Sequence, residues 1–360
     1  MADEPLTICL MGDTKFGKTS LIASLRGCVS QLAYGFEPSR HFEFRVLGQS
    51  LLSPQNFASG SYNDIEGRLF GAGQGTAVER TFQYEFEIRL TRYSLHPAAT
   101  EVCPIRIHDT GGAVWMSNVK EYVAENSIFL ENFERYRDEV LPQATGLILV
   151  IPLFETWEVR NEVPWRDRMS ELLEAVTTDP RFNRIRRIAV AMTHYERLFV
   201  NFGAAAARVA SDPTVAKEVL KEAVGRMRKQ QLAVQLLTRH NHGRQIFFMP
   251  VSAHGFVRGN GCPNFDPSTN LLLRRTLGEA NESGRRELWR PFCTADPFLF
   301  AGTGEKGLYM FTYAELADES DLDRRAPDTP DRNGGAKTGP HGESGRFRPA
   351  LRAILNRLLH

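Results

Sequence analysis

The sequence has little surplus charge, few cysteines and no apolar stretch long enough to cross a bilayer. Its 44 lysines and arginines nearly balance 43 acidic residues, for a formal net charge of +1, so we expect no general nucleic-acid surface. The five cysteines are scattered without metal-ligand spacing, which is typical of reduced thiols in the cytosol. The longest apolar run, near residues 146–154, is well short of the roughly 20 residues that span a membrane.

The remaining composition is that of an ordinary globular protein. Hydrophobic residues make up 42% and charged residues 24% of the chain, which argues against a fibrous or wholly disordered protein. The first five residues include two acids and differ from a signal peptide. We therefore expect a soluble, cytoplasmic protein with no transmembrane segment.

Apolar runs alternate with helical segments along most of the chain. Short apolar runs predict buried strands at residues 6–11, 146–153, 187–193 and 245–251. Residues 82–90 alternate apolar and polar side chains, and with residues 102–107 they predict an antiparallel hairpin. Helical periodicity predicts helices over residues 18–26, 120–140, 165–176 and 212–239. This alternation predicts an α/β fold with a mostly parallel sheet.

The turn between the first strand and the first helix carries a phosphate-binding motif. Residues 12–19 fit G-x-x-x-x-G-K-[ST] completely, in the strand-to-helix context that the motif requires. Gly12 and Gly17 allow a tight turn whose N–H groups point inward, and the helix N-terminus adds positive potential. Lys18 is a candidate catalytic charge for the β- and γ-phosphates, and Thr19 offers a hydroxyl to Mg²⁺. The expected nucleotide-binding residues here are Gly12, Asp13, Thr14, Lys15, Phe16, Gly17, Lys18, Thr19 and Ser20.

A second candidate site follows the predicted hairpin, where residues 109–112 read Asp-Thr-Gly-Gly. The carboxylate of Asp109 can hold the Mg²⁺ shell, and the backbone N–H of Gly112 can approach a γ-phosphate. Alone, such a pattern is more often a surface turn. Its position at a strand end behind a phosphate-binding loop favours function.

Two further candidates follow later strands. Thr193, His194 and Glu196 come after the strand at 187–193, and Ser252 and Ala253 come after the strand at 245–251. Ligands of open α/β sheets bind at the carboxyl ends of the strands. A carboxylate at position 196 can accept hydrogen bonds from guanine N1–H and its exocyclic amine, which adenine does not offer in that arrangement. The alternative is that Glu196 merely begins a surface helix.

These four motifs, in this order, make residues 5 to about 255 similar to the Ras-like GTPases of the translation-factor class. The resemblance implies a P-loop NTPase three-layer sandwich with a mostly parallel sheet and one antiparallel strand, GTP or GDP as ligand, and Mg²⁺. The base motif departs from the family pattern N/T-K-x-D, since His194 and Glu196 replace Lys and Asp. The enlarged spacings and the Trp-Arg-Pro-Phe stretch at 289–292 also resemble the bacterial double-GTPase group. ATPases with an extra central strand commonly place Glu after the metal-binding Asp, where this chain has Thr110.

The resemblance also implies slow catalysis. The family places a water-orienting Gln directly after D-x-x-G, and this chain has Ala113 there. Gln74, Thr76 or a partner in trans could substitute, and Thr76, or alternatively Thr81, could add a second hydroxyl to Mg²⁺. Lys15 occupies a place where some relatives bind potassium, so it either supplies a built-in cation or points into solvent.

Three functions are compatible with these motifs. The first is a GTP-dependent switch that hydrolyses GTP slowly and docks an effector or activating protein when the loop around residues 37–76 orders. The second is a nucleotide-bound scaffold without turnover, which Ala113 favours. The third is a P-loop kinase of a small substrate, whose lid would have to come from the arginines at 181–187.

The chain divides into a main domain and a tail. We expect a P-loop domain over residues 1–313 with insertions at about 37–76 and 203–240, a disordered linker over 317–345, and an amphipathic helix over 346–360. The linker has one aliphatic residue and no aromatic, too little to form a core. The terminal helix either covers the sheet or docks on a partner or anionic surface.

Overall fold

The computed structural model describes most of the predicted core. The described residues are 5–12, 16–27, 40–46, 58–59, 82–92, 99–109, 136–153, 176, 178–229, 243–257, 260–265 and 289–317. The predictions for the linker, the terminal helix and residues 165–175 lie outside these ranges. Among the described residues, no helix has the length and apolar character needed to cross a membrane.

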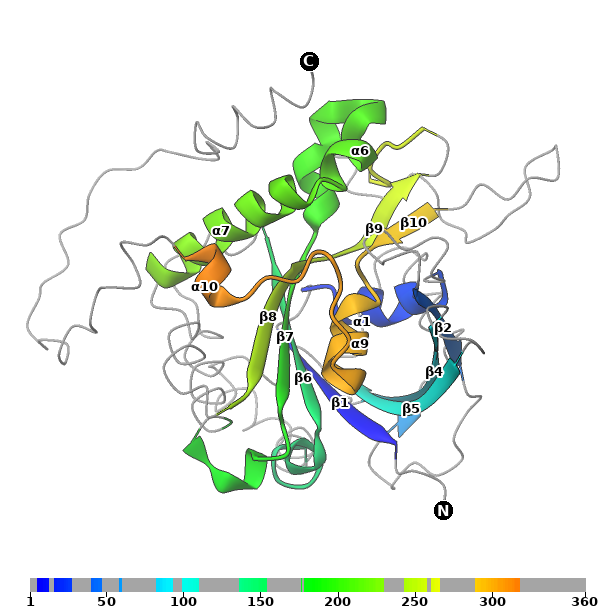
Figure 1. Ribbon diagram of the computed structural model, residues 1–360, viewed down its shortest axis with the longest axis vertical. Coiled ribbons are helices and arrows are strands. Elements are labelled where there is room, and N and C mark those ends of the chain that lie inside the picture. Colours follow the sequence, from blue (N-terminus) through cyan, green and yellow to red (C-terminus); the bar gives the residue numbers. More distant parts are fainter. Residues whose placement is uncertain are drawn as a thin grey trace, which may run out of the picture.

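Eight of the ten described strands form one sheet (Figure 1). Its order along the main path is β2 (Arg40–Val46), β4 (Phe82–Arg92), β5 (Ala99–Asp109), β1 (Leu6–Met11), β6 (Gly146–Pro152), β7 (Arg187–Thr193) and β8 (Gln245–Pro250). Neighbours from β5 to β8 are parallel, whereas β4 runs antiparallel to both β5 and β2. The two-residue β3 (Ala58–Ser59) pairs with β4. The predicted mostly parallel α/β sheet with an antiparallel strand is confirmed.

The central strands are covered on both faces, which makes the sheet the middle layer. Every residue of β6 is buried, and so are all but the first residue of β1 and of β7. One cover is α9 (Asp296–Thr303), which packs on β1, β6 and β7 and lies in front of β1 and β6 in Figure 1. The approach is close at Gly146, where any Cβ would collide with the backbone of Ala301.

The predicted hairpin is present as β4 and β5. Tyr84, Phe86 and Ile88 are buried, while Glu85 and Glu87 between them are half-buried, as expected for a sheet with one wetter face. The register pairs Phe82 with Asp109, so β5 ends where β4 begins. The carboxyl end of β5 thereby brings Asp109 beside β1.

The helices confirm part of the prediction. The helix α1 (Lys18–Ala23) continues as the 3₁₀ turn η1 (Ser24–Gly27), and α7 (Pro213–Lys229) begins at the predicted proline. Asp212 caps it, because its Oδ1 accepts a 2.7 Å hydrogen bond from the N–H of Thr214. Of the helix predicted at 120–140, the described part is a π-helical turn, η3 (Tyr136–Val140).

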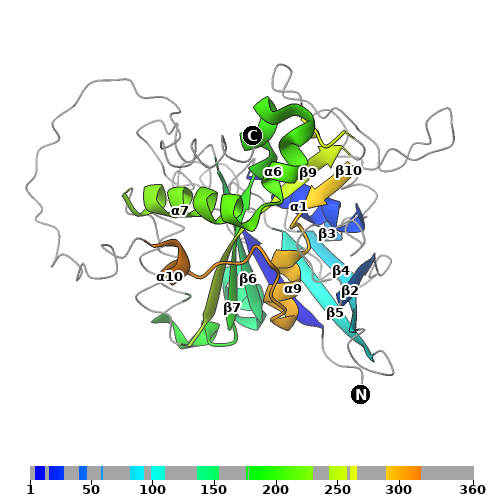
Figure 2. The same cartoon turned by 45° about the horizontal axis from the view of Figure 1, so that its top comes forward.

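Several elements differ from the sequence-based expectation. The edge strand β2 lies inside the segment predicted as a loop, although Arg40–Val46 alternates polar and apolar residues as strands do. The pair β9 (Ser252–Val257) and β10 (Trp289–Phe292) forms a second, antiparallel sheet. The remaining short helices are η4 (Leu141–Gln143), η5 (Pro180–Phe182), η6 (Tyr195–Ala205), α6 (Ala206–Ala210) and α10 (Tyr313–Leu316). Figure 2 shows β9 and β10 close to α1 and α6.

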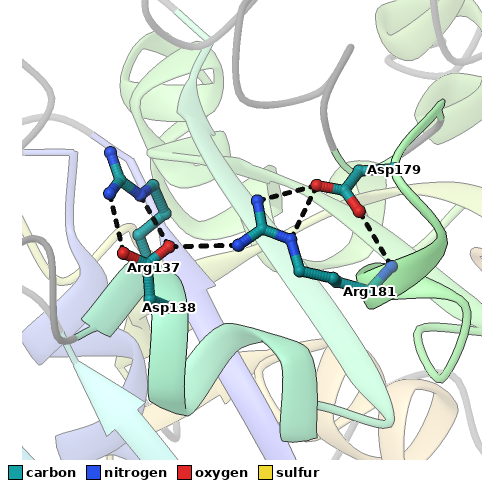
Figure 3. A network of polar contacts seen from close by, with 4 residues as sticks. All are labelled: Arg137, Asp138, Asp179 and Arg181. Atoms are coloured by element: carbon teal, nitrogen blue, oxygen red, sulfur yellow. Dashed lines mark hydrogen bonds and ion pairs between the residues drawn. The ribbon is translucent and has the colours of Figure 1, made fainter.

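An exposed ion network lies at the amino edge of the sheet, on the turns that precede β6 and β7 (Figure 3). Arg137 contacts Asp138 at 2.7 Å, and Arg181 bridges Asp138 at 3.3 Å and Asp179 at 2.7 Å. Hydrogen bonds from Arg137 lower the pKa of Asp138. Water screens such pairs, so we expect them to add little stability.

One buried carboxyl group is unusual. Asp296 begins α9, is 1% exposed, and its Oδ2 has no hydrogen-bond partner among the described residues. A Cβ at Gly307 would lie 2.9 Å from that oxygen, so the backbone closes over it. Burial raises the pKa of Asp296 to about 7, against a lowering contribution from Cys293.

This raised pKa predicts a stability that falls with pH. The folded state keeps the proton that the unfolded state loses near pH 3.8, so the contribution of Asp296 to stability is greatest below that pH. It declines until about pH 7, by on the order of 4 kcal/mol for a shift of about three units. We expect Asp296→Asn to remove most of this decline when urea unfolding is measured from pH 4 to pH 8. Asp138→Asn, at the exposed network, is the matched control, and an unchanged slope in Asp296→Asn would contradict the assignment.

Candidate functional site

The phosphate-binding motif lies between β1 and α1. Glycine is required at positions 12 and 17 for different structural reasons. A Cβ at Gly12 would lie 2.6 Å from the carbonyl oxygen of Val150 on β6, so a side chain there would displace the neighbouring strand. Gly17 has a φ of 91° at the start of α1, a left-handed conformation that favours glycine. Asp13, Thr14 and Lys15 lie outside the described residues.

Lys18 is drawn into this turn. Its side chain is 6% exposed, and its Nζ donates a 2.7 Å hydrogen bond to the carbonyl oxygen of Gly12. The ammonium group therefore lies where the helix N-terminus and the turn add positive potential. A buried cation at this point suits an anionic ligand such as a phosphate. Ser20, two residues further along α1, is half-buried.

Thr19 on α1 contacts Asp109 at the carboxyl end of β5, although 90 positions separate them in the sequence. The Thr19 hydroxyl donates a 3.0 Å hydrogen bond to Oδ2 of Asp109. Asp109 is 1% exposed, and its Oδ1 has no hydrogen-bond partner among the described residues. Burial raises the pKa of Asp109, while Lys18 and Thr19 lower it. A hydroxyl beside a buried carboxylate oxygen fits a small hard cation such as Mg²⁺.

The segment after β7 is attached to the phosphate-binding turn. Thr193 is 4% exposed, and its hydroxyl donates a 2.8 Å hydrogen bond to the carbonyl oxygen of Phe16. His194 has a φ of 64°, which is uncommon for a residue with a side chain. Its Nε2 lies 3.9 Å from the position that a Cβ would take at Gly17. Thr193 and His194 therefore hold the base motif against the turn.

Glu196 lies one residue further on, in a buried position. Its side chain is 1% exposed, and neither carboxylate oxygen has a hydrogen-bond partner among the described residues. His254 Nδ1 is 3.7 Å from Oε1, which is longer than a hydrogen bond. Burial raises the pKa of Glu196, but His254, His194 and Ser252 outweigh it and bring the pKa down to about 2. Both oxygens of this ionised carboxylate are buried and have no hydrogen-bond donor among the described residues, so each can still accept an N–H group.

Ser252 and Ala253 begin β9, one residue after β8 ends. The Ser252 hydroxyl accepts a 2.7 Å hydrogen bond from the N–H of Gly255, which fixes the turn of the backbone. The N–H of Tyr195 donates to the carbonyl oxygen of Val251 at 3.3 Å. The ends of β7 and β8 are thereby joined, and both predicted base segments lie side by side.

An aromatic cluster that the sequence reading missed supports this region. Tyr195 contacts Phe199 with 4.9 Å between ring centroids, and Phe292 with 5.2 Å. Phe256 and Phe292, from β9 and β10, meet edge to face at 6.2 Å. All four rings are buried, so they fix η6 against the second sheet. His254 was also missed, although it directly follows the Ser-Ala pair.

The structure does not describe every predicted site residue. Thr76, Gly112 and Ala113 lie outside the described ranges, as does Lys15. The described candidates form two groups at the carboxyl ends of the parallel strands. One group is Lys18, Thr19 and Asp109; the other is Thr193, His194, Glu196, Ser252 and Ala253.

No protein-family model and no curated protein matches the sequence. One similar solved structure is the signal recognition particle receptor SRb-GTP/SRX complex from Chaetomium thermophilum, with 15% identity over 72% of this chain and 95% of that chain (TM-score 0.35). Another is the S. cerevisiae Ski7 GTPase-like domain, bound to GTP (14% identity, 69% of this chain and 43% of that one, TM-score 0.32). The same domain bound to GDP and inorganic phosphate has 13% identity over 73% and 47% (TM-score 0.35). This chain spans less than half of the Ski7 chains. Similarity of this size fixes neither fold nor ligand, so the fold assignment rests on strand order and register.

The Thr193 hydroxyl should be needed for ligand binding rather than only for folding. Thr193→Val keeps the shape of the side chain but removes the hydrogen bond to Phe16, which costs about 1–3 kcal/mol when the groups are buried. We expect nucleotide affinity in an equilibrium titration to fall roughly ten-fold or more. Thr193→Ser, which restores a hydroxyl, should recover most of it. Equal affinities of wild type and Thr193→Val would show that this contact does not position the turn.

Proposed function

We propose that this protein binds GTP and GDP with Mg²⁺ and acts as a nucleotide-dependent molecular switch that hydrolyses GTP slowly. The observation that supports it is the convergence of two buried groups at one edge of the sheet. Lys18, Thr19 and Asp109 suit a phosphate chain with its cation, and Glu196 suits a base. The hydrogen bond from Thr193 to Phe16 joins the two groups, as a ligand with both a phosphate and a base end requires.

The proposal of a phosphate group at one end of the ligand follows from the positive charge at the start of α1. Lys18 neutralises phosphate oxygens, and the N–H groups at the start of α1 add hydrogen bonds. Thr19 and Asp109 would hold Mg²⁺, which supplies charge neutralisation between the β- and γ-phosphates. The Asp109 oxygen that has no hydrogen-bond partner among the described residues is the natural ligand or outer-shell acceptor.

The base end follows from the two open oxygens of Glu196. Guanine presents N1–H and an exocyclic N–H₂ side by side, and an ionised carboxylate accepts both. Adenine presents a donor beside an acceptor, so its ring nitrogen would face a carboxylate oxygen across the pair. Leaving a buried charged oxygen against an acceptor is costly. Glu196 therefore favours guanine.

The proposal of slow GTP hydrolysis follows from the alanine at position 113. A switch GTPase orients the attacking water with a hydrogen-bonding side chain after D-x-x-G, and alanine has none. We propose that Thr76, Lys15 or a partner contributes to catalysis, and that the loop around residues 37–76 orders around the γ-phosphate. A partner that docks there would read the bound nucleotide.

Base preference is tested by Glu196→Gln. The amide loses the charge and one acceptor, so GTP affinity should fall about 100-fold, while ATP affinity should change little. Isothermal titration with GTP and ATP measures both. Lys18→Ala is the contrasting variant, because losing the phosphate charge should weaken both nucleotides alike. Equal affinity of wild type for GTP and ATP would refute the proposed base.

Turnover is tested by phosphate release from the isolated chain. We expect a rate on the order of 10⁻⁴ s⁻¹, the intrinsic rate of a switch GTPase without its activator, and loss of activity in excess chelator. Ala113→Gln should increase the rate if a water-orienting group is what is missing. No release above background, with GTP tightly bound, would favour the scaffold instead.

A further inference from the structure

Glu196 carries its charge in a place that disfavours charge. Its side chain is 1% exposed, and an ionised carboxylate without compensation is expensive to bury. The pKa of Glu196 nevertheless falls to about 2, because neighbouring groups outweigh the effect of burial. Something near the carboxylate must therefore compensate its charge before any base arrives.

The nearest basic group is His254 on β9. Its Nδ1 lies 3.7 Å from Glu196 Oε1, and its side chain is 20% exposed. The ring meets His194 edge to face, with 6.4 Å between centroids. At 3.7 Å the two groups are within ion-pair distance, but the contact is longer than a hydrogen bond. Both carboxylate oxygens keep their lone pairs for a ligand.

Two other basic side chains on neighbouring elements, Lys18 and Arg197, make contacts of their own. Lys18 of α1, which packs against β9, donates its Nζ to the carbonyl oxygen of Gly12. The guanidinium of Arg197 lies over the ring of Phe265, 4.7 Å from its centroid. His254 contacts the Glu196 carboxylate at ion-pair distance, and His194 also lowers the pKa of that carboxyl group.

We propose that His254 is a positioning residue of the base site, which keeps Glu196 ionised and leaves both of its oxygens without a hydrogen bond, so that they can accept a pair of base N–H groups. This role rests on the proposed binding of guanine. It makes selectivity depend on position 254, which the family pattern of four motifs leaves unspecified. The base site would then include three consecutive residues of β9: Ser252, Ala253 and His254.

Nucleotide titrations of three variants test this role. His254→Gln and His254→Ala should lower GTP affinity about ten-fold or more, and should reduce the preference for GTP over ITP, which lacks the exocyclic amine. ATP affinity should stay the same. His254→Lys restores a positive charge and should recover most of the preference, which a purely structural role would not do. His41→Gln, on strand β2 at the far edge of the sheet, is the matched control.

A nucleotide-free measurement separates this role from the proposed function. The carboxyl ¹³C shift of Glu196 should show a pKa near 2 in the wild type. In His254→Gln the pKa of Glu196 should rise, because burial raises it and His254 no longer opposes that effect. An unchanged titration, or unchanged GTP preference in folded His254→Gln, would overturn the role of His254. A wild-type chain that does not prefer GTP would overturn the proposed function, and the titration would then decide the charge pairing alone.

Discussion

The in-register parallel pairing of β1 with its two neighbours is the constraint on which the site depends. Leu10 pairs with Asp109 on one side and with Ile148 on β6 on the other. Parallel strands end at the same edge, so Asp109 arrives beside the turn that leads to α1 without any contact specific to it. The same alignment, carried through β6 and β7, delivers Thr193 to the other side of that turn. A shift of one residue would turn each of these side chains to the opposite face.

Much of this could be predicted from the sequence, because the signals were local. A complete phosphate motif between a strand and a helix, and continuous apolar runs such as the one that forms β6, each carry their own physical reason. In the same way, the alternation of apolar and polar side chains over residues 82–90 predicted the antiparallel strand β4. Asp109 was found because the hairpin pattern ends on it. Such patterns need no knowledge of the rest of the chain.

What could not be predicted depends on contacts between distant segments. The second sheet joins β9 to β10 across more than 30 positions, and its burial comes from rings such as Phe256 and Phe292. The sequence motif at 193–196 gave Glu196 no partner, since His254 becomes a neighbour only when β7 and β8 lie side by side. By contrast, β2 was missed for a weaker reason. Its alternation is visible, but the stretches at 60–64 and 71–75, which begin or repeat with glycine, led to a loop prediction for the whole segment.

Two buried carboxylates stand at the ends of the site, and their opposite pKa shifts have one explanation. Burial dominates at Asp109 and raises its pKa, while neighbouring histidines dominate at Glu196 and lower its pKa. Asp109 therefore lacks part of the positive charge that a cation would supply, whereas Glu196 already has it and lacks only hydrogen-bond donors. A ligand with a cation at one end and two N–H donors at the other would satisfy both. A ligand that binds the folded chain and not the unfolded one would stabilise the fold, by an amount that grows as its concentration rises above Kd.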